Sequence, residues 1–253
     1  MPISRTRALR IVRLIRREQD VTARRLSAGL RTLFRKQARY ATQVFLDEPV
    51  KARGAPHLPH YKNLSADAMI PPGDDEAMFL LARQHLGRMF VQVGAMAAEL
   101  AGSEPIVADT VTYEVLVRKA GRRLRNVNNT TRSAIRSTLA DGFSRGFSPA
   151  QIAQGVPAEG FTGLRSVVQE TYRGRAETIA RTESAIASQE AASDRYAAAG
   201  VTHVQIEDGP ECGWTEHDDG DIADGSIRTL ADANTYPIAH PNCVRVSLPI
   251  LPS

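Results

Sequence analysis

The chain has 253 residues, a formal net charge of +4, 42% apolar residues and 6% aromatic residues. This balance excludes a wholly disordered chain, and the low aromatic content argues against a β-sandwich. Its two cysteines exclude a disulfide framework and suit a reducing compartment, although a single bridge between them stays open. We expect no secretory signal, because Arg interrupts each apolar stretch near the N-terminus, and no membrane span, because no apolar run approaches about 18 residues.

The charge is distributed very unevenly. Residues 1–40 hold twelve Lys or Arg and two acids, a net charge of +10, whereas residues 41–253 hold 20 bases and 26 acids, a net charge of −6. Residues 205–224 alone contain eight carboxylates and neither Lys nor Arg. The N-terminal segment is therefore expected to attract polyanions and the acidic segment to attract cations.

Residues 5–46 are predicted to form one helix or two. Ile11, Val12 and Ile15 share one face, and Leu26 and Leu30 continue the three-four spacing farther along. The arginines admit three interpretations: a solvated face of a packed helix, a contact to nucleic acid or an acidic partner, or a membrane-surface helix. The candidate DNA- or partner-binding residues are Arg5, Arg7, Arg10, Arg13, Arg16, Arg17, Arg24 and Arg25.

Five prolines within residues 47–73 predict a linker. A helix follows with Asp74 as its expected N-cap, and Gly102 ends it. Its expected buried stripe is Leu86, Met89, Phe90, Val93, Ala97 and Leu100. The next helix is predicted from about Thr110 to Leu139, stopping near Gly142.

The C-terminal half begins with Ser148 and Pro149, which suit the N-cap and first turn of a short helix. Residues 164–199 predict a long helix, and nine alanines between 176 and 199 indicate that it is central to its domain, before Gly200 ends it. Strand-like residues then occur at 201–206, 226–229 and 244–248.

The predicted fold class is mainly α, with a helical body followed by a small, short-stranded α+β cap at the C-terminus that zinc could stabilise. The predicted organisation is a basic helical arm and Pro-rich linker at 1–73, a helical region at 74–140, and a final domain at 141–253 that carries a Cys/His cap.

Cys212 and His217 form one closely spaced pair, and His240 and Cys243 form another. Zinc commonly takes four sulfur or nitrogen ligands from two such pairs. The spacing therefore suggests a structural zinc site with a filled ligand shell, and the alternative is a buried cysteine pair with unrelated histidines. The neighbouring aspartates Asp218, Asp219, Asp221 and Asp224 do not follow the calcium-binding pattern of an EF-hand and indicate a solvated turn.

Common catalytic motifs are missing from the sequence. There is no GxxxxGK[ST] phosphate loop, no GxSxG, HExxH or GxGxxG motif, and no zinc-deaminase pair. We therefore expect no enzymatic activity. The alternative is a metal-dependent nuclease, or another enzyme acting on nucleic acid, that uses His217, Asp218, Asp219 and His240.

Four segments together resemble the phage Mu F-like minor head proteins, also called the phage head morphogenesis family. They are the run GFSRGFS at 142–148, the run RAETIARTE at 175–183, the helix end and strand start from Tyr196 to Val201, and HPNCVR at 240–245. The core of the second segment is Ile179, Ala180, Arg181, Thr182 and Glu183. The similarity covers about residues 130–250.

Two positions depart from the family pattern. Many members have CxxC before HPNC, whereas this chain has Thr215 three positions after Cys212, and Arg245 replaces the family's final cysteine. These departures make His217 the expected substitute ligand.

The resemblance implies a minor capsid protein of a tailed bacteriophage that acts in head morphogenesis or early DNA delivery. Its implied partners are the portal protein, other head proteins and packaged double-stranded DNA, which it would bind without sequence preference. No contact with a membrane is implied in the assembled head. Its implied location is the virion, in the head interior or at the portal vertex, after assembly in the host cytoplasm.

Overall fold

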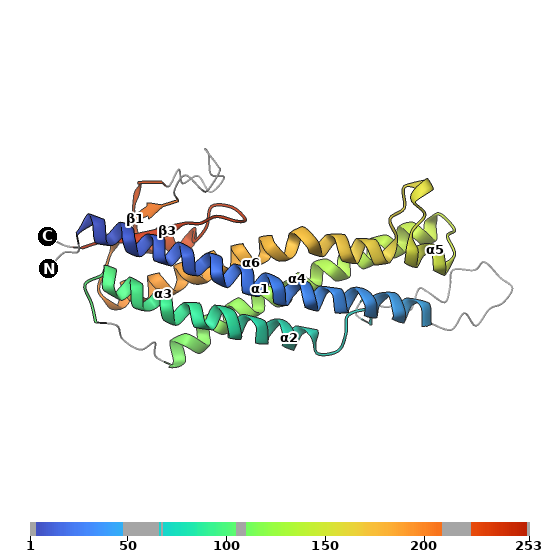
Figure 1. Cartoon of the computed structure of the whole chain (residues 1–253), viewed down its shortest axis with the longest axis horizontal. Coiled ribbons are helices and arrows are strands. Elements are labelled where there is room, and N and C mark those ends of the chain that lie inside the picture. The colour runs from blue at the N-terminus through green and yellow to red at the C-terminus, as the bar shows by residue number, and fades with distance from the viewer. Residues whose placement is uncertain (1–3, 48–65, 67, 105–109, 209–223, 252–253) are drawn as a thin grey trace. The chain divides into compact units, whose positions relative to one another are not determined.

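The computed structural model describes residues 4–47, 66, 68–104, 110–208 and 224–251. Over these residues the chain is mainly helical, with a small antiparallel sheet near the C-terminus, which confirms the predicted fold class at this level (Figure 1). No helix within these ranges is long and apolar enough to cross a lipid bilayer.

The chain divides into two compact units, each built from separated stretches. Unit 1 comprises Met1–Ser27, Leu80–Gly121 and Glu177–Ser253, and unit 2 comprises Ala28–Phe79 and Arg122–Ala176. The division predicted from the sequence follows the chain in order, and its boundaries at 73 and 140 stay predictions.

Helix α1 spans Arg5–Asp47 without a break, so the segment predicted as one helix or two is one. In unit 1 its residues Ile11, Ile15 and Leu26 are buried, with exposed fractions of 3% or less. These apolar side chains pack into the core, so this part of α1 is an integral helix of unit 1 and not a detached arm.

The second helical stretch has three parts: α2 (Asp74–Leu81), a π-helical turn η2 (Ala82–Leu86) and α3 (Gly87–Leu100). All six residues of the predicted stripe from Leu86 to Leu100 are buried. Asp74 is not the N-cap but the first helical residue, and its buried carboxylate accepts a hydrogen bond from Lys36 at 3.4 Å. The carbonyl of Gly73 accepts the first intrahelical bond, from the N–H of Ala77 at 2.9 Å, so Gly73 and not Asp74 holds the N-cap position.

Helix α4 (Thr110–Ser144) ends at the GFSRGFS motif, which forms a turn in unit 2. Arg145 lies over the rings of Phe147 and Phe161, 5.9 and 5.8 Å from their centroids, and its Nε donates to Asp141 at 2.9 Å. Ser148 then caps α5 (Pro149–Gln154) through a reciprocal pair of hydrogen bonds with Gln151, which confirms the predicted cap. The motif is thus accounted for by local structure.

A short 3-10 turn, η3 (Pro157–Glu159), leads into α6 (Gly163–Ala198). In unit 1, α6 is buried on nearly every side from Glu183 to Tyr196, which confirms that it is the central helix of this unit. Its many Ala and Ser residues allow neighbouring elements to approach closely. Gly200, at φ +74°, ends the helix as predicted.

The C-terminal cap of unit 1 contains β1 (His203–Glu207), β2 (Ile227–Thr229), the short helix α7 (Leu230–Thr235) and β3 (Val246–Ile250). The strand order is β2-β1-β3 with both pairings antiparallel, and Gln205 lies opposite Ile227 and Leu248. Val204 and Ile206 are buried on the inner face, and Tyr196 of α6 donates to the carbonyl of Ser247 at 2.8 Å. The sheet is therefore packed on α6.

The turn before α6 generates a test in unit 2. Gly163 has φ +77°, and a Cβ atom there would lie 2.2 Å from the backbone nitrogen of Gly155. Gly160 also has a positive φ, +69°, but nothing lies within 4 Å of its absent Cβ. We predict that Gly163→Ala lowers the free energy of unfolding by about 3 kcal/mol or more, whereas Gly160→Ala lowers it by about 1–2 kcal/mol.

Urea denaturation followed by circular dichroism measures both variants against the unchanged chain. Equal losses of stability in the two variants would contradict the close backbone contact between Gly155 and Gly163.

Candidate functional site

The centre of the cap is a buried ion pair between Arg245 and Asp208, whose side chains are 1% and 2% exposed. Arg245 Nε donates to Asp208 Oδ1 at 2.8 Å, and Nη2 donates to Oδ2 at 3.2 Å. Nη1 donates to the carbonyl of Tyr236 at 2.7 Å. This two-point geometry satisfies both charged groups in a site from which water is excluded.

The same ion pair is held from outside the sheet. Asp224 Oδ1 accepts from the backbone N–H of Asp208 at 2.9 Å. From α1, Gln19 Nε2 donates to the carbonyl of Arg245 at 3.4 Å, and Arg16 Nη2 donates to the carbonyl of Glu207 at 3.1 Å. The first half of α1 is thus attached to β1 and to the start of β3 by polar contacts as well as by its apolar face.

Arg245 stands where the resembling family has its final cysteine. In this chain the position carries a buried cation paired with Asp208, and sequence reasoning did not predict that role. The only sign of this role in the sequence was that Arg245 immediately precedes one strand and Asp208 immediately follows another. Their proximity depends on the pairing of β1 with β3.

The structure describes two of the four predicted zinc ligands. His240 and Cys243 are 9% and 1% exposed, and the backbone N–H of Cys243 donates to the carbonyl of His240 at 3.1 Å. His240 Nδ1 lies 2.8 Å from the carbonyl oxygen of Pro241. Metal-binding histidines commonly make such a contact through their second ring nitrogen, so this turn fits a ligand pair.

The other two predicted ligands, Cys212 and His217, lie outside the described residues, as do Asp218, Asp219 and Asp221. Among the described residues, no cluster of three or more His, Cys, Asp or Glu side chains could hold a metal ion. Both interpretations of the Cys/His pairs therefore stay predictions.

Two of the motifs meet in unit 1. We call residues 179–183 the IARTE segment and residues 240–243 the HPNC turn. The backbone N–H of Asn242, in the HPNC turn, donates to the hydroxyl of Thr182, in the IARTE segment, at 3.2 Å. Asn242 has φ +69°, a left-handed conformation that Asn tolerates better than most residues. This contact joins two segments that are 60 residues apart in the sequence.

The other residues of the IARTE segment follow the packing of α6. Ala180 is buried and Glu183 is 8% exposed, while Ile179 is half-buried. Arg181 lies 3.8 Å from Glu177, one turn earlier, with both side chains about half exposed. This ion pair therefore faces solvent.

The predicted binding arginines fall into three groups. Arg10, Arg13, Arg17 and Arg24 are exposed on the side of α1 away from the core. Arg7 pairs with Glu99 at 2.7 Å, and Arg16 is bonded to the cap. Arg5 and Arg25 each line a pocket. Six of the eight arginines are therefore exposed and form no ion pair within the part of the chain that the structure describes.

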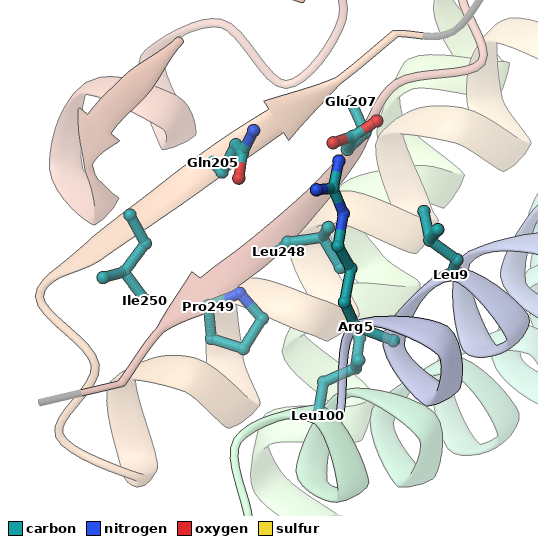
Figure 2. A pocket seen from close by; sticks show the side chains of 9 residues that line it. Arg5, Leu9, Leu100, Gln205, Glu207, Leu248, Pro249 and Ile250 are labelled. Atoms are coloured by element: carbon teal, nitrogen blue, oxygen red, sulfur yellow. The ribbon is translucent and has the colours of Figure 1, made fainter. Parts of the chain in front are cut away.

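Figure 2 shows the pocket that Arg5 lines, between the first turns of α1, the end of α3 and the strands β1 and β3. Its volume is about 400 Å³, and Leu9, Leu248 and Ile250 contribute its apolar lining. Arg5 extends toward the carboxylate of Glu207 (Figure 2). Burial raises the pKa of Glu207, Asp224 adds to the rise, and Arg16 and Arg5 oppose it.

Comparison with family models, with curated proteins and with solved structures finds no match to this chain. The resemblance to the phage head morphogenesis family therefore rests on the four sequence segments.

The buried ion pair predicts a large and specific loss of stability. Asp208→Asn leaves the guanidinium of Arg245 buried without its counter-charge, so we expect the free energy of unfolding to fall by about 3–5 kcal/mol. Replacing both partners with apolar residues, as Asp208→Leu with Arg245→Met, should be less damaging than the sum of the two single changes.

Chemical denaturation of the single and double variants measures the coupling between the two side chains. The control is Arg181→Gln, which removes an exposed ion pair and should change stability by no more than about 1 kcal/mol. Additive single changes, or an Asp208→Asn loss as small as the control, would show that the pair does not hold the cap.

Proposed function

We propose that this chain is a structural protein of a tailed-bacteriophage head. It contacts the portal, other head proteins and packaged double-stranded DNA, acts in head morphogenesis or early DNA delivery, and has no catalytic turnover. It assembles in the host cytoplasm and resides in the head interior or at the portal vertex.

The observation that carries this proposal is the contact between Thr182 and Asn242. The IARTE and HPNC segments were matched to the family separately, by residue pattern alone. Their meeting at one hydrogen bond supports a shared origin, because unrelated short matches have no reason to be neighbours in the fold. The buried surroundings of Ala180, Glu183 and Cys243 support a structural role for both segments.

The DNA contact is assigned to the exposed arginine face of α1, defined as Arg10, Arg13, Arg17 and Arg24. These residues span about 21 Å of helix at 1.5 Å per residue. Arginine forms two-point hydrogen bonds with phosphate, so such a face suits a duplex backbone. Contacts of this kind are independent of base sequence and depend steeply on salt.

Zinc is proposed as a structural ion held by Cys212, His217, His240 and Cys243. When bound, it would cross-link the segment after β1 to the turn before β3 and so contribute folding energy to the cap. The described ligands support this by sharing one buried turn.

The arginine face gives a direct test of DNA binding. Changing its four arginines to Gln should weaken binding to a duplex of mixed sequence and reduce the slope of log K against log salt by about 3 to 4. The fold should be retained, because all four side chains are exposed. The matched control changes four exposed basic residues of α4 to Gln, namely Arg118, Lys119, Arg122 and Arg125.

Fluorescence anisotropy at several salt concentrations measures both sets of variants. Equal losses in the two sets would contradict a specific face. The same DNA, incubated with the protein and Mg²⁺ or Mn²⁺, should stay intact, and cleavage would favour the nuclease alternative. Peptide mass spectrometry of purified phage heads should detect the chain, and its absence from complete heads would overturn the virion assignment.

The zinc proposal predicts about one zinc ion per purified chain. Cys212→Ser and Cys243→Ser should each abolish it and destabilise the cap, while the helical circular dichroism signal remains largely intact. Elemental analysis after exhaustive dialysis measures the metal. Zinc-free protein with an intact cap would contradict the proposal and favour a cap held by the Arg245–Asp208 pair alone.

A further inference from the structure

A second pocket lies where α1 passes the π-helical turn η2, within unit 1. It has a volume of about 260 Å³ and is lined by Thr22 and Arg25 from α1, Gln84 and His85 from η2, and Arg88 from α3. Each of these side chains can donate a hydrogen bond, and no carboxylate belongs to the lining. The pocket therefore has the donor set of an anion site.

The π turn explains why these residues converge. Ala82, Leu86 and Phe90 are buried at intervals of four residues, with exposed fractions of 3% or less. In a regular α-helix two such steps would rotate Phe90 about 80° away from Ala82, and the wider turn at Ala82–Leu86 reduces that rotation. The core is thus kept in register while Gln84, His85 and Arg88 stay beside α1. Single π turns of this kind are frequent at functional sites.

The charges around the pocket favour a bound anion. Arg25 and Arg88 are exposed, and neither forms an ion pair with any carboxylate in the described part of the chain. Burial lowers the pKa of His85, and the nearby Arg25 lowers it further. The two guanidinium groups around one cavity repel each other and disfavour a charged imidazole beside them, and a bound anion would relieve that repulsion.

We propose that this pocket, formed by Thr22, Arg25, Gln84, His85 and Arg88, binds a phosphate group. Two arginines match the oxygen geometry of phosphate through paired N–H donors, and the Thr hydroxyl and Gln amide complete a shell of neutral donors. The phosphate belongs either to a nucleic-acid backbone or to a small phosphorylated molecule. The pocket shares no residue with the proposed DNA-binding face of Arg10, Arg13, Arg17 and Arg24. Its proposal therefore does not depend on that face.

The first experiment titrates the 253-residue chain with inorganic phosphate at constant ionic strength and follows the ring signals of His85 by NMR. We expect a saturable shift of these signals. Arg88→Gln and Arg25→Gln should each weaken phosphate binding by about tenfold or more, as expected for the loss of a charged hydrogen-bond donor. The matched control, Arg118→Gln, removes an exposed arginine elsewhere in unit 1 and should change the affinity by less than about twofold.

The second experiment repeats the comparison with a mixed-sequence DNA duplex and identifies the source of the phosphate. If Arg88→Gln weakens both ligands, the pocket takes a backbone phosphate; if it weakens inorganic phosphate alone, the ligand is a small phosphorylated molecule. Thermal unfolding of the variants confirms that each one is folded. The proposal is overturned if the His85 signals do not respond saturably to phosphate, or if Arg88→Gln binds it as well as the control does.

Discussion

The arrangement of unit 1 depends on one buried ion pair. Arg245 and Asp208 lie 37 residues apart in the sequence and almost completely out of water, so each is tolerated only because the other is present. The pair fixes the end of β1 against the start of β3. From α1, Gln19 donates to the carbonyl of Arg245, and Arg16 donates to the carbonyl of Glu207, the residue before Asp208. The N-terminal helix and the C-terminal sheet are therefore coupled through the same few groups.

This coupling determines what the basic N-terminal segment can do. Because Ile11, Ile15 and Leu26 pack in the core, α1 is held in one rotational position. Its exposed arginines then form a fixed face, and Thr22 and Arg25 are brought beside the π turn. A positive charge that would extend and repel itself in a free arm is thus arranged by packing into a surface and a pocket, two settings in which arginine is well suited to bind phosphate.

Much of the fold could be predicted from residue pattern because its signals are local. Apolar periodicity located the helices, Ser148 and Gly200 located a start and an end, and the strands were found to within about two residues. The π turn was missed because buried residues four apart look like an ordinary helical stripe, and α7 was missed because six residues are too few for periodicity. The roles of Asp208 and Arg245, and the pocket at His85, depend on which elements become neighbours, and short-range patterns carry no such information.

Native-state hydrogen exchange of Asp208→Asn, followed by mass spectrometry, tests the coupling through the ion pair most directly. We expect amides in β1, in β3 and in the first half of α1 to lose protection together, while the half of α4 and the half of α6 that belong to unit 2 keep theirs. Loss confined to β1 and β3, with α1 fully protected, would contradict the claim that Arg245 and Asp208 hold the N-terminal helix and the cap as one unit.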